Sequence, residues 1–524
     1  MVPPRFQPLL DETAPLAKLF ADAGFKLYLV GGIVRDTLLG RTRAELDIDL
    51  TTDANPDEIE RLVRLANPTA MWMQGKRFGT IGAAFTTPNG KRDYEITTHR
   101  GEVYHEDSRK PDVVFATDIA ADLSRRDFTV NAMALDLASL ELIDPFDGAL
   151  DLVNGRLCTP LSPTESFSDD PLRMLRAARF ISGFGFKPDP ELFDAVVALR
   201  DRMKIVSAER IRGELDKLLV TANPAAGLWF LVETRLADSF LPELSAMQLE
   251  QDPIHRHKDV LAHTIAVVQK TSPERVLRMA ALLHDIAKPK TRSIGPGGVS
   301  FHHHDIVGAR MARDRLRALK YSNEDVADIS ELVALHLRFH TYSMGWTDSA
   351  VRRYVRDAGP LLDKLNELTR CDCTTRNPRK AAMLAKRMDD LEVRIAELRA
   401  QEELDAIRPD LDGAAVMAHL GITPSRAVGE ALDMLLEARM EHGPLEHEDA
   451  IARLDAWWAA RSVESGRGGS GRPGARGSKG SDSGSVAAPE AGASFGPETS
   501  RAISTDSVPK TDEPAASSND GPVA

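Results

Sequence analysis

The sequence predicts a mixed α and β amino-terminal half, of α/β or α+β class, followed by an all-helical second half. Between residues 25 and about 150, short runs of β-forming residues alternate with turn signals; the runs are FKLYLV, ELDIDLTT, TIGAAFTT and DYEITTHR. From about Phe167 to Trp458, apolar residues recur at helical spacing, as in DPLRMLRAARFI and ERIRGELDKLL, and we expect no further β-rich run. The 524 residues are enough for about three domains.

Composition limits what any motif can mean. The net charge of −13 argues against nucleic-acid binding over the whole surface, so an RNA site would have to be a local basic patch. No apolar run approaches the roughly 18 to 20 residues that a membrane helix needs, and the amino terminus lacks a basic segment followed by an apolar one. The three cysteines are too few for a disulfide framework. These features predict a cytoplasmic protein with no membrane partner.

Two stretches interrupt the helical half, and a third ends it. The segment SIGPGGVS at 293–300 predicts a long internal loop, and the stretch from Leu241 to Asp252 predicts a domain boundary. After Arg461 the chain consists mainly of Gly, Ser, Pro and Ala, with almost no large apolar residues. Because such a segment cannot bury a core, we expect residues 462–524 to be disordered.

The first chemical signal is the sequence VGGIVRDTLLGRTRAELDIDL, which begins at Val30. The run LYLV that ends at Val30 is typical of a buried strand. Gly31 and Gly32 can then turn tightly and offer backbone N–H groups to a phosphate. Arg35 would face the same anion.

The strand that follows, from Glu45 to Leu50, predicts a metal site. Side chains alternate between the faces of a strand, so Asp47 and Asp49 project together while the apolar residues beside them face a core. Carboxylate oxygens suit Mg²⁺, which keeps waters and recruits substrate phosphates. The Gly-Gly motif alone is more typical of a turn, and the Asp-x-Asp motif alone is more typical of a solvated strand face. The two together indicate a binding site for a phosphate and for the metal ion that accompanies it.

A second cluster, DLSRRDFTVNAMALD, spans residues 122–136. Arg126 could clamp a triphosphate, and Asn131 could form a hydrogen bond with a sugar hydroxyl. The alternative interpretation of the same residues is a charged helix cap.

Five motifs, in this order, resemble the bacterial branch of the tRNA nucleotidyltransferase and poly(A) polymerase family, which is distantly similar to DNA polymerase beta: LVGGIVRDTLLGRTRAELDIDLTT, RRDFTVNA, DPFDGALDLVNGRLCT, SDDPLRMLRAARF and ERIRGELDKLL. The match covers about residues 25 to 220. The resemblance implies an α+β fold with a polymerase-beta-like head, a small mixed sheet, a helical neck, an HD domain and a tail. The expected bounds are 1–160 for the catalytic head, 161–245 for the neck that recognises nucleotide and RNA, 246–380 for the HD domain, 381–461 for a helical tRNA-binding body and 462–524 for the tail.

The resemblance also implies roles for single residues. Asp47 and Asp49 would hold Mg²⁺, and Glu95 in the strand DYEITT is the candidate third carboxylate, with Asp93 on its face. The segment YHEDSRKP at 104–111 occupies the place of the family's mobile loop, which helps change nucleotide preference during addition. Contacts with the triphosphate or nucleotide are implied for Gly32, Arg35, Arg126, Arg176 and Arg179.

Base selection without a nucleic-acid template is implied for the motif SDDPLRMLRAARF. Asp170 and Arg173 stand three residues apart, which predicts that they share one helical face. A carboxylate accepts hydrogen bonds and a guanidinium donates them, so Asp170 would take the amine of cytosine or adenine and Arg173 would serve the ring nitrogen beside it. Guanine and uracil reverse both groups and would be refused. A surface ion pair is the alternative.

The helical half carries a second constellation, in HRHKDVLAHT, ALLHDIAKPK, FHHHDIVGA, LHLRFH and RCDC. It resembles the HD metal-dependent phosphohydrolase superfamily, whose pattern is a His, an adjacent His-Asp pair and a distant Asp. A transition metal is the implied cofactor, and domains of this kind can also persist as scaffolds that do not catalyse hydrolysis. The implied ligands are His263, His284, Asp285 and Asp372, with His304 and His336 as supplementary ligands.

Three functions fit these residues. The first is addition of C, C and A to the 3′ end of tRNA from CTP and ATP by a two-metal mechanism, and some members of the family add only CC or only A. The second is poly(A) polymerisation by the same head. The third is an HD phosphohydrolase whose head only binds RNA. The intact Asp-x-Asp with its Gly-Gly and arginines argues against the third. The attached HD region and the segment at 411–432 resemble the long form of the tRNA enzyme, and the neutral tail does not match the basic tail usual in poly(A) polymerases of this branch, so the resemblance favours CCA addition.

Overall fold

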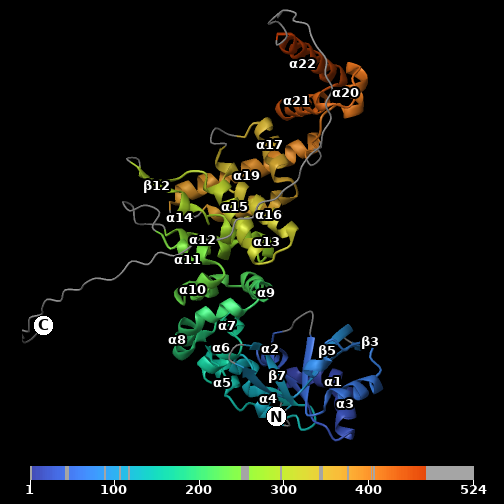
Figure 1. Ribbon diagram of the computed structural model, residues 1–524, viewed down its shortest axis with the longest axis vertical. Coiled ribbons are helices and arrows are strands. Elements are labelled where there is room, and N and C mark those ends of the chain that lie inside the picture. Colours follow the sequence, from blue (N-terminus) through green and yellow to red (C-terminus); the bar gives the residue numbers. More distant parts are fainter. Residues whose placement is uncertain are drawn as a thin grey trace, which may run out of the picture. The chain divides into compact units, whose positions relative to one another are not determined.

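The structure is a computed structural model that describes residues 3–41, 47–87, 90–105, 108–115, 118–249, 259–295, 298–341, 346–373, 377–402, 404 and 407–467. Side chains are described for these residues except in the ranges 101–117 and 462–467 and at 341. The chain divides into two compact units, Met1–Ala459 and Ala460–Ala524. Within the first unit, strands gather in the amino-terminal part, which is blue in Figure 1, and helices make up most of the remainder.

The amino-terminal part is built on a seven-stranded sheet in the order β3-β4-β5-β2-β1-β8-β9. β2 and β5 run parallel and the other neighbours are antiparallel, which confirms the predicted small mixed sheet and the α+β class. The strands are β1 (Leu27–Val30), β2 (Asp47–Thr52), β3 (Ala70–Trp72), β4 (Thr80–Thr87), β5 (Gly90–Thr98), β8 (Ala134–Asp136) and β9 (Leu142–Ile143). A separate hairpin consists of β6 (Arg100–His105) and β7 (Ser108–Phe115), and the helices are α1 (Gln7–Asp22), α2 (Gly32–Leu38), α3 (Pro56–Leu65), α4 (Ile119–Ser124) and α5 (Gly148–Asn154).

The alternation predicted for the strand at residues 45–50 is present in β2. Ile48 and Leu50 are buried, whereas Asp47 is exposed and Asp49 is half-buried. Because β2 lies parallel to β5 in register, Asp49 stands opposite Glu95. The two central strands therefore bring two carboxylates to one face of the sheet.

The following helices pack into one continuous core with the sheet. Local sequence sets several of their starts, because a side-chain cap and a proline at the first position favour helix entry. Ser162 accepts a hydrogen bond from Glu165 N–H ahead of Pro163, and Asp189 caps the helix that begins at Pro190. The helices are α6 (Pro163–Asp169), α7 (Leu172–Phe184), α8 (Pro190–Leu199), α9 (Ala208–Leu219), α10 (Pro224–Glu233) and α11 (Pro242–Ala246).

The next region is helical except at one place, where the prediction is wrong. The expected loop at 293–300 is part of an antiparallel hairpin of β12 (Arg292–Gly295) and β13 (Gly298–Phe301). Its glycines and serines suggest a loop, but Ile294 and Val299 pair across the strands, and Gly298 adopts a positive φ of 101° beside the turn. The helices are α12 (Val260–Lys270), α13 (Arg275–Leu283), α14 (Lys288–Thr291), α15 (His304–Ala318), α16 (Asn323–Leu335), α17 (Asp348–Ala358) and α18 (Leu362–Asp372).

The remaining helices are α19 (Pro378–Gln401), α20 (Gly413–Leu420), α21 (Arg426–His442) and α22 (His447–Arg467). Apolar residues of α20, α21 and α22 form a second hydrophobic core with Leu411. α22 continues to Arg467, and residues 468–524 lie outside the described residues, so the disorder expected from residue 462 onward stays a prediction. Across the part of the chain that the structure describes, no helix combines the length and the apolar character that crossing a membrane requires.

Candidate functional site

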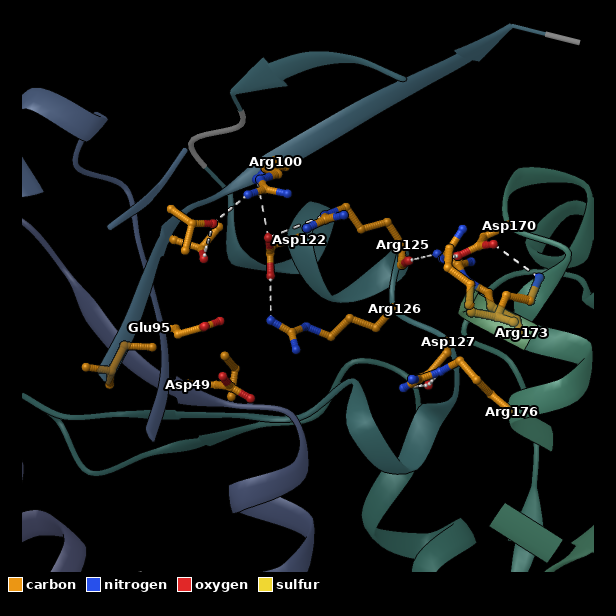
Figure 2. A pocket seen from close by; sticks show the side chains of 16 residues that line it. Asp49, Glu95, Arg100, Asp122, Arg125, Arg126, Asp127, Asp170, Arg173 and Arg176 are labelled. Carbon is orange, nitrogen blue, oxygen red and sulfur yellow. Dashed lines mark hydrogen bonds and ion pairs between the residues drawn. The ribbon is translucent and has the colours of Figure 1, made fainter. Parts of the chain in front are cut away.

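A cavity of about 390 Å³ lies where the sheet meets α7 and α9 (Figure 2). It gathers carboxylates and arginines that are up to about 160 positions apart in the sequence, which is how a site for a charged ligand is built from distant segments. Six of the predicted site residues line it: Asp49, Glu95, Arg126, Asp170, Arg173 and Arg176. The other charged residues that line it were not predicted: Arg100, Asp122, Arg125, Asp127 and Arg210.

Gly31 lies at a position that favours glycine over every residue with a side chain. It precedes α2 with φ 74° and ψ −136°, a backbone conformation that side chains rarely adopt. A Cβ atom there would lie 3.0 Å from Nη1 of Arg126 and 3.9 Å from Oδ2 of Asp49. The absence of a side chain at Gly31 therefore allows the guanidinium of Arg126 to approach the turn beside the carboxylate of Asp49.

Arg126 is oriented by Asp122, which is almost fully buried. Nη2 of Arg126 donates a 3.1 Å hydrogen bond to Oδ2 of Asp122, and the backbone N–H of Arg100 donates to Oδ1. Burial disfavours the charged carboxylate, but Arg126 and Arg125 outweigh burial and lower the pKa of Asp122. Asp122 is thus an ionised anchor that connects Arg126 with the first residue of β6.

Arg176 is held by carboxylates from two segments. Its Nε and Nη2 donate to Oδ2 of Asp127 at 2.9 and 2.6 Å, and its Nη1 donates to Glu214 at 3.3 Å. Arg179 donates from Nε to the other oxygen of Glu214, so it lies behind Arg176 and does not line the cavity. Asn131 donates from its amide nitrogen to Oδ1 of Asp127.

We expect this pairing to make stability depend on pH through Asp127. Burial opposes its ionisation, but Arg176 and Asn131 outweigh burial and lower the pKa of Asp127 to about 2. A carboxyl with a lowered folded-state pKa stabilises the fold above its unfolded pKa of about 3.9, and this stabilisation of about 2 kcal/mol is lost as pH falls toward 2. Asp127→Asn should therefore lower the melting temperature at pH 7, and at pH 3, which lies between the two pKa values, the difference should be about half as large.

Thermal unfolding of both proteins at pH 7, 5 and 3 checks this expectation. Asp194→Asn, at an exposed position on α8, is the matched control. A melting-temperature difference for Asp127→Asn that stays constant down to pH 3 would contradict the assignment of this carboxylate.

The prediction that Asp170 and Arg173 share a helical face is wrong. α6 ends at Asp169, Asp170 is extended with φ −133° and ψ 99°, and α7 begins only at Leu172. The reason is Pro171, because the residue before a proline avoids the helical conformation. Both side chains nevertheless line the cavity.

Arg35 is not brought to the cavity. Its guanidinium is buried, pairs with Asp36 at 2.8 Å, donates to the amide oxygen of Asn131 and lies 4.4 Å from the ring centre of Phe184. Gly32 begins α2 beside it. Asp47 shares the face of Asp49 but does not line the cavity either. The implied phosphate and metal contacts of these three residues, Gly32, Arg35 and Asp47, stay predictions, as does the role of the 104–111 segment, whose side chains lie outside the described residues.

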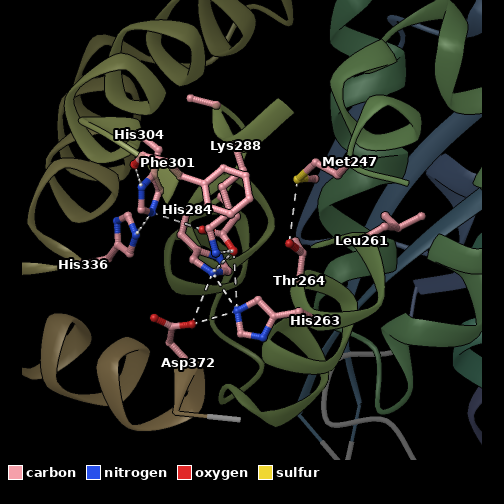
Figure 3. A network of polar contacts seen from close by, with 12 residues as sticks. Met247, Leu261, His263, Thr264, His284, Lys288, Phe301, His304, His336 and Asp372 are labelled. Atoms are coloured by element: carbon pink, nitrogen blue, oxygen red, sulfur yellow. Dashed lines mark hydrogen bonds and ion pairs between the residues drawn. The ribbon is translucent and has the colours of Figure 1, made fainter. Parts of the chain in front are cut away.

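A second cluster forms among the helices from α12 to α18, where the six predicted HD residues converge (Figure 3). His263 Nε2 lies 2.9 Å from Oδ1 of Asp372 and 3.4 Å from His284 Nε2. His304 Nε2 lies 3.3 Å from His336 Nε2 and 3.5 Å from Oδ1 of Asp285. The ligand atoms of five of these residues form two groups that could each hold a metal ion. One group is His263, His284 and Asp285, the other is Asp285, His304 and His336, and Asp372 is in neither.

The other nitrogen of three of these rings shows how the cluster is oriented. Nδ1 of His284 lies 2.8 Å from the carbonyl oxygen of Ala281, and Nδ1 of His304 and His336 lie at 2.8 and 2.6 Å from the carbonyls of Phe301 and Val333. A carbonyl accepts only, so each Nδ1 carries a proton, and Nε2 is the ring atom that faces the centre and would bind a metal once it is deprotonated. This arrangement is characteristic of metal-binding histidines.

Charge in the cluster also favours a cation. Oδ1 of Asp285 is buried and accepts no hydrogen bond from the residues that the structure describes, while Oδ2 lies 2.7 Å from Nζ of Lys288. Burial disfavours a charged His284, but Asp285 and Asp372 outweigh burial and raise its pKa to about 10. Two carboxylates thus attract positive charge to a buried centre, and the donor set of imidazole nitrogens and carboxylate oxygens fits a transition metal.

Comparison with known proteins matches three parts of the chain to described families. Residues 27–158 match the poly A polymerase head domain, residues 185–248 match the probable RNA and SrmB-binding site of polymerase A, and residues 260–398 match the HD domain.

Curated relatives are similar over different lengths. An A-adding tRNA nucleotidyltransferase of Deinococcus radiodurans is 34% identical over 442 residues, which cover 82% of this chain and 95% of that protein. A CCA-adding enzyme of Staphylococcus aureus is 38% identical over 244 residues, which cover 46% of this chain and 58% of that enzyme. The similarity to the A-adding protein therefore extends over nearly its whole length, whereas the similarity to the CCA-adding enzyme does not.

Solved structures share the fold. The CCA-adding enzyme of Bacillus stearothermophilus in complex with CTP superposes with a TM-score of 0.60 at 24% identity, covering 88% of this chain and 100% of that one. The CCA-adding enzyme of Thermotoga maritima complexed with a tRNA gives a TM-score of 0.51 at 20% identity, covering 87% and 96%.

Proposed function

Because the chain belongs to the tRNA nucleotidyltransferase and poly(A) polymerase family, we propose that it adds C, C and A to the 3′ end of tRNA from CTP and ATP. The observation that carries this proposal is the composition of one cavity. Carboxylates for a metal, arginines for phosphates and a carboxylate–guanidinium pair for a base all line it. A hydrolase with an RNA-binding head would not need all three together.

The reaction forms a bond from the 3′ oxygen of the RNA to the α phosphorus and breaks the bond to the leaving pyrophosphate. Asp49 and Glu95 would hold Mg²⁺ in this two-metal scheme, together with the predicted ligand Asp47, and the bound ions supply the positive charge that activates the hydroxyl and neutralises pyrophosphate. Arg126 lies beside Asp49 and would neutralise the triphosphate. Arg176 enters the cavity from α7 and would bind the nucleotide from the opposite side.

The residues that line the cavity come from two parts of the chain, to which we assign different roles. Head residues 1–160 supply Asp49, Glu95 and Arg126, and neck residues 161–245 supply Asp170, Arg173 and Arg176. We assign residues 246–380 to the HD domain and 381–461 to a tRNA-binding body, with 462–524 as a tail. Partial proteolysis followed by mass spectrometry tests these bounds.

One experiment separates the candidate activities. The protein is incubated with tRNA transcripts that end before the CCA sequence or after CC, with CTP, ATP or both, and the products are resolved at single-nucleotide length. Full CCA addition predicts two added residues with CTP alone and three with both nucleotides. A poly(A) polymerase would add a long A tract, and a chain that adds nothing to either transcript would contradict the proposal.

Addition of A alone is the second candidate. Its support is the relative that matches over most of its length, which is an A-adding protein. In the same experiment, such an enzyme would extend the transcript that ends in CC with one A, and would leave the shorter transcript unchanged with CTP.

We expect Asp170 to determine the choice of base. Asp170→Ala removes the acceptor for the amine of cytosine and adenine, and loss of one hydrogen bond to a charged group costs about 2 kcal/mol, or about thirtyfold in kcat/KM. The variant should also discriminate less against UTP and GTP, while its Kd for tRNA stays within about twofold. Incorporation of all four nucleotides measures this, and unchanged discrimination with normal rates would refute the role.

We further propose that the six-residue cluster binds transition-metal ions and supports phosphohydrolase activity. The support is the geometry of the Nε2 atoms and of Asp285, which belongs to both ligand groups. The metal would polarise a phosphoryl oxygen. Hydrolysis of a phosphodiester probe in the presence and absence of a chelator tests the activity.

A further inference from the structure

The carboxylate of Asp170 has a partner on another helix. Nη2 of Arg210, at the start of α9, donates a 2.7 Å hydrogen bond to Oδ2 of Asp170. Oδ1 of Asp170 accepts from the backbone N–H of Leu172 at 3.1 Å. Both oxygens are therefore anchored, each by one donor, and because a carboxylate oxygen has two lone pairs, each can still accept a further hydrogen bond.

Arg173 is held by a different set of contacts. Its side chain is buried, Nη1 donates to Oγ of Ser166 at 2.9 Å, and Nη2 donates to the backbone oxygen of Arg125. Among the residues that the structure describes, the guanidinium that contacts Asp170 is that of Arg210, which lies in the same cavity and is 44% exposed. The orientation of Asp170 thus depends on Arg210 and not on Arg173.

α9 fixes other cavity residues in the same way. Glu214 follows Arg210 by one helical turn, so the two side chains lie on one face of α9. Glu214 holds Arg176 and Arg179 of α7, with distances of 3.3 and 2.6 Å. One face of α9 therefore carries a cation that pairs with Asp170 and an anion that pairs with Arg176 of the cavity and with Arg179 behind it.

We propose that Arg210 is a positioning residue for nucleotide selection. It would hold the carboxylate of Asp170 so that it faces the exocyclic amine of cytosine or adenine. This inference rests on the proposed function. Guanine and uracil carry a carbonyl where cytosine and adenine carry that amine, and a ring N–H where cytosine and adenine have an unprotonated ring nitrogen. Without Arg210, the carboxylate is anchored at one oxygen only and can turn to accept that N–H instead.

The test compares Arg210→Ala with the unsubstituted full chain in incorporation of each nucleotide. We expect kcat/KM for CTP and ATP to fall about tenfold and misincorporation of UTP and GTP relative to them to rise about tenfold, as for loss of one charge-assisted hydrogen bond. Arg210→Lys keeps a donor and should retain most of the selectivity. Lys217→Ala, at an exposed position two turns further along α9, is the matched control and should behave as the unsubstituted chain does.

A double-mutant cycle identifies the residue through which Arg210 acts. If Arg210 acts through Asp170, adding Arg210→Ala to Asp170→Ala leaves selectivity where Asp170→Ala alone puts it. The proposal is overturned if Arg210→Ala keeps normal selectivity, including the case in which it only weakens tRNA binding as a phosphate contact would. Equilibrium binding of the four nucleotides gives the same comparison without tRNA, so a failure of tRNA addition by the unsubstituted chain contradicts the proposed function and still leaves Arg210 tested.

Discussion

Asp49→Ala is expected to lower nucleotide addition by about a thousandfold, because removal of one group that stabilises transition-state charge costs up to that factor. Asp49 is half-buried on β2 opposite Glu95, and both carboxylates line the cavity. The apolar side chains of β2 face the core on the other side, so the free energy of unfolding should change by no more than about 0.5 kcal/mol. Single-turnover addition to tRNA and thermal unfolding measure the two effects.

Variants on the neighbouring strand sharpen this test. Glu95→Gln should also cause a large loss, whereas Asp93→Asn serves as the matched control because Asp93 stands opposite Asp47 and outside the cavity. If Asp93→Asn loses most of its addition activity while Glu95→Gln keeps normal activity, Asp93 and not Glu95 is the third metal-binding carboxylate. Normal addition by both Asp49→Ala and Asp47→Ala would remove the basis for a metal at β2.

Asp285→Ala is expected to remove bound transition metal from the second cluster almost completely. Asp285 belongs to both groups of ligands, so its loss weakens each, whereas His336→Ala should weaken only the group formed with His304. Elemental analysis of the purified proteins gives the metal content per chain. His302→Ala is the control, because His302 is exposed and is not part of either group.

Nucleotide addition by Asp285→Ala should stay within about twofold of normal, since the cluster and the cavity have no residue in common. Metal content that is unaffected by Asp285→Ala would contradict the ligand assignment. Lost addition in a variant that keeps its melting temperature would show that the two sites depend on each other.

Local patterns were sufficient for the central strands of the head and for the face of the sheet on which Asp49 lies. The alternation in β2 places Ile48 and Leu50 in the core and Asp49 on the other face, and this depends only on neighbouring residues. The fold class and the family followed from ordered motifs, and the HD residues converge as the resemblance implies. These features could be predicted because each depends on neighbouring residues or on motifs that follow one another in a known order.

Contacts between helices could not be predicted in the same way. Arg210 and Asp170 are 40 residues apart, and nothing in either segment shows that α9 brings them together. Arg35 looks like a phosphate ligand beside Gly32, yet its position next to Asp36 and Phe184 buries it. The hairpin at 292–301 was missed because its short strands are rich in glycine and serine, and pairing between strands outweighs their weak local preference.

The contacts of Arg173 have a consequence for how the chain tolerates change. Two of its acceptors are backbone oxygens, those of Ser166 and Arg125, and a backbone oxygen is present whatever side chain the position carries. The side chain at 125 can therefore vary during evolution or in library screening with little loss of this anchor, whereas Ser166 also contributes its Oγ. The hydrogen bond to Oδ2 of Asp170, by contrast, comes from a side chain, so it depends on the identity of residue 210. Attempts to redesign which nucleotides are accepted should thus sample positions 170 and 210 jointly and leave 173 constant.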